Sequence, residues 1–172
     1  SETISIPQML RDAATRFDSQ ARSAGITVIV PLPNGPLHVR GDSFWLARAL
    51  NELLENALAF TPSGGTIHLS AQIVDAAGEL PQVAISVCDE GPGIRTEDLA
   101  RILSSSFYRG QIEDTGHIEG MGLGLTITRL IAERHGGWLA AENNGDPGQG
   151  CTFSLILPLA APGPASLPRD GS

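Results

Sequence analysis

The chain has 172 residues and a formal net charge of −8, with 41% hydrophobic and 17% charged residues. One domain of this size buries a sizeable core, and the composition is typical of a soluble globular protein. The negative charge argues against nucleic-acid binding, which relies on a basic surface.

The first half of the sequence predicts two helices among short strands. The first helix runs from Pro7 to about Ala24, where Gly25 ends it. The second begins after Asp42, which can cap it, and is apolar over most of its surface. Alternating apolar residues from 67 to 73 predict a strand with one covered face. Two further short strands are predicted, at Thr3–Ile6 and Ile26–Val30, and a brief extended piece is expected at Leu37–Arg40.

The second half predicts a strand at Gln82–Cys88, which we expect to pair with the preceding strand as a hairpin. A short helix, Glu97–Leu103, precedes Ser104–Glu119, a stretch without any period that predicts a long functional loop. A helix ending at His135 follows. The last predicted strands are Trp138–Glu142 and Cys151–Leu157.

This order of elements predicts an α+β fold, a two-layer α/β sandwich. We expect a mixed, mostly antiparallel sheet of about five strands, covered on one face by about three helices. The domain spans residues 1–159, and a Pro/Ala/Gly-rich tail, 160–172, is expected to be disordered. Cys88 and Cys151 lie in apolar runs and are expected to be small buried side chains, not a disulfide or a metal pair.

The stretch Gly120-Met121-Gly122-Leu123-Gly124-Leu125 runs straight into a helical pattern. Its glycines let backbone N–H groups approach a ligand closely, and a helix that opens there suits phosphate. A flexible turn before an ordinary amphipathic helix explains the stretch equally well by itself. A dinucleotide motif fits less well, because Leu125 stands where the third glycine belongs. The expected apolar face of the helix consists of Leu123, Ile127, Leu130 and Ile131.

Four stretches occur together in one order: Glu52-Leu-Leu-Glu-Asn56-Ala, Asp89-Glu-Gly91-Pro-Gly93-Ile94, the glycine stretch above, and Gly148-Gln-Gly150-Cys-Thr152-Phe. They closely resemble the N, G1, G2 and G3 boxes of the ATP-binding catalytic domain of sensor histidine kinases. That family belongs to a superfamily with gyrase, MutL and the large heat-shock chaperones. The resemblance covers about Thr3 to Pro158. It implies the Bergerat ATP-binding fold, the cofactors ATP and Mg²⁺, and an ATP lid at about 104–122.

On the second helix, the resemblance implies that Asn56 coordinates the Mg²⁺ that bridges the phosphates, since Mg²⁺ prefers oxygen ligands. An Asn that only makes local hydrogen bonds is the alternative. Glu52 lies one turn earlier on the same face. Many histidine kinases have Asn there, and a Glu resembles the gyrase and MutL branch, in which it is the general base for ATP hydrolysis.

For the base, the resemblance implies that Asp89 accepts a hydrogen bond from the exocyclic amine of adenine. A turn-forming Asp is the alternative, since such turns are common before Gly. Gly91 and Gly93 let the backbone pass close to the base, and Ile94 is expected to line the pocket. The resemblance places Thr152 near the adenine.

For the phosphates, the resemblance makes Gly120–Leu125 their seat, and Phe107-Tyr108-Arg109-Gly110 resembles the F box. Tyr108, Arg109 and His117 are the candidates to reach the phosphates. Arg109 has the strongest claim, because its permanent charge can compensate the γ-phosphate. For His117, the role of a solvated loop residue is a serious alternative to contact with the phosphates. The other histidines, His38, His68 and His135, are expected at the surface or at sheet edges.

The implied function is to bind Mg²⁺–ATP and donate its γ-phosphoryl group to a histidine in two-component signalling. No His is followed by an acidic residue, Arg and Pro, so the phosphoacceptor is expected on a separate dimerisation domain of the same full-length protein, beside a response regulator as partner. Two alternatives share the fold: an anti-sigma-factor serine kinase, and a MutL- or gyrase-like ATPase clamp that uses Glu52.

The expected assembly is a full-length homodimer in which this domain alone is monomeric. Nothing resembles a signal peptide, and no apolar run is long enough to span a bilayer, so a cytoplasmic domain is expected. Whether the full-length protein is membrane-anchored is open. No nucleic-acid partner is expected.

Overall fold

The computed structural model describes residues 1–75, 80–103, 122–145 and 149–161. Most of the predicted lid and all but the first two residues of the predicted tail lie outside these ranges. The helices are α1 (Ile6–Ala24), α2 (Ser43–Phe60), α3 (Thr96–Leu103) and α4 (Gly122–Arg134). The strands are β1 (Glu2–Ser5), β2 (Thr27–Ile29), β3 (His38–Gly41), β4 (Thr66–Val74), β5 (Gln82–Cys88), β6 (Trp138–Asn143) and β7 (Cys151–Pro158).

Five strands form the main sheet, in the order β2-β4-β5-β7-β6. Only β2 runs parallel to its neighbour β4, and the other three pairs are antiparallel. The predicted five-stranded, mostly antiparallel sheet and its β4–β5 hairpin are therefore confirmed. A second, two-stranded sheet joins β1 to β3. The sequence predicted β1 as a strand and the β3 segment as an extended piece, but not their pairing, which links segments more than thirty residues apart.

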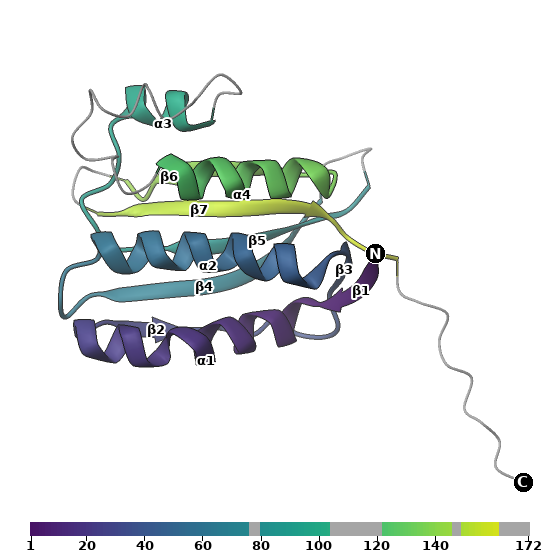
Figure 1. Ribbon diagram of the computed structural model, residues 1–172, viewed down its shortest axis with the longest axis horizontal. Coiled ribbons are helices and arrows are strands. Elements are labelled where there is room, and N and C mark those ends of the chain that lie inside the picture. The colour runs from purple at the N-terminus through teal and green to yellow at the C-terminus, as the bar shows by residue number, and fades with distance from the viewer. Residues whose placement is uncertain (76–79, 104–121, 146–148, 162–172) are drawn as a thin grey trace, which may run out of the picture.

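Helices α1, α2 and α4 lie side by side over one face of the sheet, and α3 stands at one end beyond α4 (Figure 1). The alternation in β4 follows this arrangement, because Ile67, Leu69 and Ala71 are buried while His68 and Gln72 are exposed. The fully buried leucines of α2 fill the space between the layers, and each such side chain contributes about 1.5–3 kcal/mol. The predicted two-layer sandwich is confirmed. Within the described ranges, none of the helices could cross a membrane.

Local signals in the sequence set the ends of the first two helices. Gly25 ends α1 in the left-handed conformation, with φ of 71°. Asp42 caps α2, and its carboxylate accepts hydrogen bonds from the backbone N–H groups of Phe44 and Trp45 at 3.0 and 3.3 Å. Both predicted boundaries are confirmed.

Helix α4 differs from its prediction in where it begins and in which face it buries. It begins at Gly122, so the second half of the glycine stretch is helical and not a turn. Leu123 and Leu130 are exposed, whereas Leu125 and Ile131 are buried. The helix turns the small residue Gly124 toward α2, and this close approach rotates the two exposed leucines outward.

His135 also departs from its prediction as a surface or edge residue. It is partly buried and joins the end of α4 to the start of α2. Its Nε2 accepts the backbone N–H of Asp42 at 3.1 Å, and its Nδ1 lies 2.7 Å from the carbonyl oxygen of Ile131. Since Nε2 accepts, the proton is on Nδ1, which donates to that carbonyl. Gly41 leaves room for the ring, because a Cβ there would overlap it.

Candidate functional site

The C-terminal half of α2 contacts two other parts of the chain, α4 near its middle and the loop after β5 at its end. Glu52, Asn56 and Phe60 recur every four residues and so lie along one side of the helix, over about 12 Å. The Glu52 carboxylate lies on Gly124 of α4, since a Cβ there would come 2.5 Å from its Oε2. The Phe60 carbonyl lies against Gly91, where a Cβ would come 2.7 Å from the oxygen. Asn56 lies between these two contacts.

The Asn56 side chain is buried, with 8% of its surface exposed, and its Nδ2 finds no hydrogen-bond partner among the described residues. Leaving a buried amide unpaired costs about 1–3 kcal/mol, so native proteins rarely do so without a reason. The Asn56 Nδ2 is thus available to donate to a ligand, and the same side chain carries an amide oxygen. An amide oxygen is a suitable ligand for Mg²⁺. Across the described residues, no group of three or more His, Cys, Asp or Glu could hold a metal by itself.

Arg48 is a residue that the sequence analysis missed. Its Nε donates to Glu52 Oε1 at 2.8 Å, and the Glu52 side chain is only 15% exposed. The spacing of four residues on a helix is the signal that could have found the pair. One carboxylate oxygen of Glu52 is therefore held by Arg48 while the other lies on Gly124. The role of Glu52 as a general base stays a prediction.

The contact between Glu52 and Gly124 allows a prediction about the free energy of unfolding. In a Glu52→Ala background, Gly124→Ala should stabilise the protein by up to about 1 kcal/mol, because alanine favours a helix over glycine. With Glu52 present the new methyl displaces the carboxylate, and we expect most of that gain to disappear. Urea unfolding of the four proteins measures the coupling. Additivity within about 0.3 kcal/mol would show that the two residues do not interact.

Asp89 is a buried carboxylate at the end of β5, with 6% of its surface exposed. Its Oδ1 accepts the backbone N–H groups of Gly91 at 2.9 Å and Cys151 at 3.2 Å. Burial raises the pKa of Asp89 above its ordinary value, although these two hydrogen bonds oppose the shift. No described residue donates a hydrogen bond to Oδ2. The carboxylate is thus fixed in orientation with one oxygen left for another donor.

The loop from Asp89 to Ile94 follows this carboxylate. Gly93 has φ of 78°, a conformation that favours glycine, and Glu90 Oε2 accepts the backbone N–H of Thr66 at 3.1 Å. Gly150, at the start of β7, passes so close that a Cβ would overlap the Asp89 carbonyl oxygen. The glycines Gly91, Gly93 and Gly150 therefore allow close backbone packing around Asp89.

Two further residues that the sequence analysis missed are Asn143 and Asn144, which hold this loop from the other side. Asn143 Oδ1 accepts the Ile94 N–H at 2.8 Å, and its Nδ2 donates to the Ile94 carbonyl at 2.5 Å. Asn144 Nδ2 donates to the Asp89 carbonyl at 3.0 Å. These residues lie in a stretch rich in Asn and Gly, a composition typical of turns, and no pattern of spacing indicates their partners.

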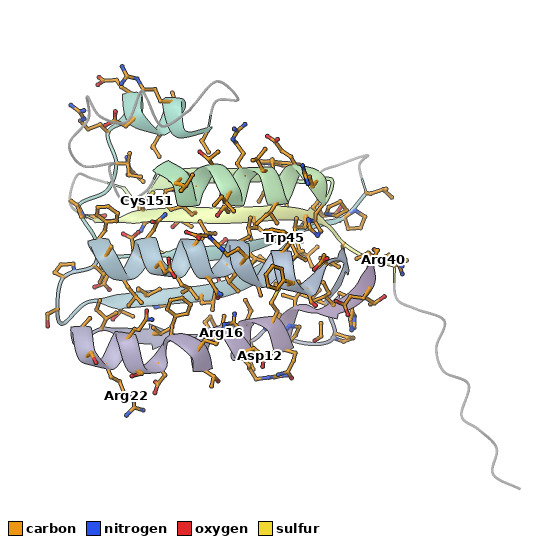
Figure 2. All side chains as sticks on the ribbon, viewed as in Figure 1. Asp12, Arg16, Arg22, Arg40, Trp45 and Cys151 are labelled. Carbon is orange, nitrogen blue, oxygen red and sulfur yellow. The ribbon has the colours of Figure 1, made fainter. Side chains whose placement is uncertain are left out.

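Thr152 and Cys151 point to opposite faces of the sheet. Cys151 is buried on the side covered by helices, and its thiol has its pKa raised to about 12, mainly by burial (Figure 2). Thr152 turns to the other side, where its hydroxyl donates to Asn144 Oδ1 at 2.5 Å. Because side chains alternate along a strand, the side chain next to Asp89 is Cys151. The geometry thus places Thr152 away from the face of Asp89, against the expectation that it lies near the base.

Thr61, just after α2, carries a second unpaired polar atom. Its side chain is buried, and its Oγ1 finds no partner among the described residues. It begins the Pro- and Gly-rich stretch that follows the helix.

The remaining site predictions divide between described and undescribed residues. Tyr108, Arg109, Gly120 and Met121 lie outside the described residues, as does His117. Gly122 to Leu125 form the first turn of α4, in which Leu125 is buried and Leu123 is exposed.

The family comparison agrees with this geometry. The sequence model of the histidine kinase-, DNA gyrase B- and HSP90-like ATPases matches residues 41–161, which is more than half of the chain. The chain therefore belongs to this ATPase family.

Within the family, the similar proteins are sensor kinases. The sensor protein DivL of Caulobacter vibrioides is 38% identical over 157 residues, which cover 91% of this chain and 19% of that protein. The sensor-like histidine kinase SenX3 of Mycobacterium tuberculosis is 33% identical over 155 residues, which cover 90% of this chain and 36% of that protein. The chain thus spans 19% to 36% of the length of these curated relatives.

Solved histidine kinases share the fold. The nucleotide-free catalytic domain of ThkA matches with a TM-score of 0.73 at 26% identity, over 91% of this chain and 95% of that one. Full-length ShkA in complex with AMPPNP matches with a TM-score of 0.73 at 27% identity, over 94% of this chain and 31% of that one. The described architecture is that of a histidine kinase catalytic domain.

Proposed function

We propose that this chain is the ATP-binding catalytic domain of a sensor histidine kinase, which transfers the γ-phosphoryl group of ATP to a histidine on a separate domain. The observation that carries the proposal is the buried Asn56 side chain, whose Nδ2 has no hydrogen-bond partner among the described residues and which lies on α2 between Glu52 at Gly124 and Phe60 at Gly91. A fold that needed Asn56 only for stability would have paired the amide or replaced it by an apolar side chain.

In the proposed site, Asp89 recognises the adenine. Its Oδ1 is occupied by two backbone N–H groups, so Oδ2 accepts the exocyclic amine of the base. Guanine presents a carbonyl oxygen at the same position, and two acceptors that face each other repel. Gly91 and Ile94 bring the loop backbone and an apolar side chain to the base.

The phosphate end lies between Asn56 and the start of α4. The Asn56 oxygen holds Mg²⁺, which when bound neutralises charge that develops on the phosphates. The backbone N–H groups of the first turn of α4, Gly122 to Leu125, bind phosphate oxygens together with the positive end of the helix dipole. Tyr108 and Arg109 remain predicted phosphate ligands. Phosphoryl transfer needs mostly positioning and charge neutralisation, which such groups supply.

The proteins with similar sequences support this function over its alternatives, because they include a sensor protein and a sensor-like histidine kinase. In such a protein, the partners of this domain are the phosphoacceptor histidine domain of the same chain and a response regulator, and the full-length protein is a homodimer. An ATPase clamp that uses Glu52 is the second candidate, favoured by one observation: the Glu52 carboxylate lies one turn from Asn56 and on the same side of α2.

Incubation with ATP labelled at the γ-position and a separately produced helical domain bearing a phosphoacceptor histidine tests the proposal. We expect label on that histidine, and no label when the histidine is replaced by alanine. Release of phosphate without transfer would favour the clamp. Glu52→Gln should then reduce that release by about 100-fold or more, as loss of a general base does.

A further inference from the structure

The loop from Asp89 to Ile94 contains two glycines and has no regular structure, yet it carries both groups that the proposed function assigns to the adenine. Six residues with Gly91 and Gly93 among them have many accessible conformations, and fixing them costs conformational entropy. A recognition loop of this kind needs contacts from outside itself to hold its shape before the ligand arrives.

Asn143, at the end of β6, holds the far end of the loop. Its side-chain amide meets the backbone of Ile94 with both functional groups, since Oδ1 accepts the N–H at 2.8 Å and Nδ2 donates to the carbonyl at 2.5 Å. This pairing fixes the position and the orientation of one residue, as a strand neighbour would. Gly93 leaves room for it, because a Cβ there would come 2.9 Å from Asn143 Oδ1.

Asn144 holds the near end. Its Nδ2 lies within 3.3 Å of three acceptors, namely the carbonyl oxygens of Asp89 and Gln149 and the Cys88 sulfur. Its Oδ1 accepts the Thr152 hydroxyl. Since all three acceptors lie on the Nδ2 side, the amide has one orientation only. Through Asn144, the backbone at Asp89 is thereby tied to the end of β6 and to Thr152 of β7.

We propose that Asn143 and Asn144 are positioning residues for adenine recognition, which preorganise the loop so that Asp89 and Ile94 are in place before nucleotide binds. This inference rests on the proposed function only for the identity of the ligand. Neither side chain needs to touch the base. They act by removing the conformational entropy that binding would otherwise have to overcome.

Asn143→Ala tests the inference, with hydrogen exchange and ATP titration as two separate measurements. Exchange of the Gly91 amide, which Asn143 does not touch, should become faster without nucleotide and return to the wild-type rate with saturating ATP. Affinity for ATP should fall by about tenfold, which is the size expected when one or two hydrogen bonds no longer contribute. Adenosine affinity should fall by the same factor, because the loss is at the base.

Asn143→Asp is the second variant, because it has the shape of Asn and keeps the acceptor for the Ile94 N–H but has no donor for the carbonyl. It should weaken ATP binding as well. Ser86→Ala is the matched control. It removes a side-chain hydrogen bond of 2.7 Å to Ser154 in the same sheet, away from the loop, and should leave both measurements unchanged.

The two possible failures give different results. If the wild-type protein binds neither ATP nor adenosine, the proposed function is wrong. The Gly91 exchange rate then still tests whether Asn143 holds the loop in place. If the wild type binds ATP and both Asn143 variants bind it within twofold as tightly, the positioning role is wrong. Unchanged Gly91 exchange in both variants would overturn it too.

Discussion

Replacing Asn56 with leucine should reduce phosphoryl transfer from ATP by at least about 100-fold, while the folded domain keeps its stability or gains about 1 kcal/mol. In the proposed site the amide oxygen holds Mg²⁺, and leucine offers no ligand atom. Stability should not fall, because the buried Nδ2 has no partner to lose among the described residues. An apolar group of similar shape also removes the cost of burying an unpaired amide. Transfer assays and urea unfolding measure the two effects.

Asn51→Leu is the matched control, since it is the same substitution one and a half turns earlier on α2. Asn51 Oδ1 accepts two hydrogen bonds from Arg16 of α1, at 2.8 and 3.3 Å, and so joins two helices away from the site (Figure 2). The Asn51→Leu variant should show the opposite result, with about 1 kcal/mol of stability lost and phosphoryl transfer unchanged. A loss of more than about 2 kcal/mol in Asn56→Leu would show that Asn56 is structural and would contradict the assignment.

The parts of the fold that sequence could predict are those set by neighbours in the chain. Asp42 caps α2 through N–H groups two and three residues away, and Gly25 ends α1 by its own backbone conformation. The alternation in β4 likewise follows from one covered face as far as Ala71, whereas Ile73, which the pattern predicts as covered, is exposed. Each of these signals lies within a few residues of the feature that it determines, so the pattern and the structure agree.

The face of α4 could not be predicted this way, because a distant residue decides it. Apolar periodicity favours Leu123 and Leu130 as core residues, but the helix approaches α2 where Gly124 meets Glu52. That contact joins residues 72 positions apart. A pattern read along one helix contains no information on the partner that it packs against, so the rotation of the helix remained undetermined.

Within the site, Asp89 and Asn56 were identifiable because the resemblance rests on short motifs around them. Asn143 and Asn144 were not, because an Asn that forms a turn and an Asn that binds a loop 49 or 55 residues away have the same local sequence. Cys151 and Thr152 show a third limit. A single step along β7 exchanges the two faces of the sheet, and a motif match does not specify which of two neighbours faces the ligand.

Asp89→Asn should weaken ATP binding by about 10- to 100-fold and remove most of the discrimination against GTP. The Gly91 and Cys151 N–H groups require an acceptor at Oδ1, so the amide must place its Nδ2 where Oδ2 was. A donor then faces the adenine amine, and a hydrogen bond to a charged acceptor, worth about 1.5–3 kcal/mol, is lost. The same donor suits the guanine carbonyl, so affinity for GTP should stay constant or rise. Titrations with both nucleotides measure the change.

The same substitution should stabilise the empty domain, in a way that depends on pH. Burial raises the pKa of Asp89, so the folded state binds a proton more readily than the unfolded chain. The stability of the wild type therefore falls as pH rises from the ordinary aspartate pKa through the raised one. Asparagine does not titrate. Its advantage over the wild type should be smallest below the ordinary pKa, where both side chains are neutral, and should reach its full size above the raised pKa.

Asp12→Asn separates these effects from a simple change of charge, since it makes the same substitution on the exposed surface of α1. It should alter neither nucleotide affinity nor the pH dependence. An Asp89→Asn protein that lost stability at neutral pH would show that the carboxylate supports the fold through a contact that the amide cannot make. If it also kept the wild-type preference for ATP over GTP, Asp89 would not be the adenine-recognising group, and the base would have to bind elsewhere on the loop.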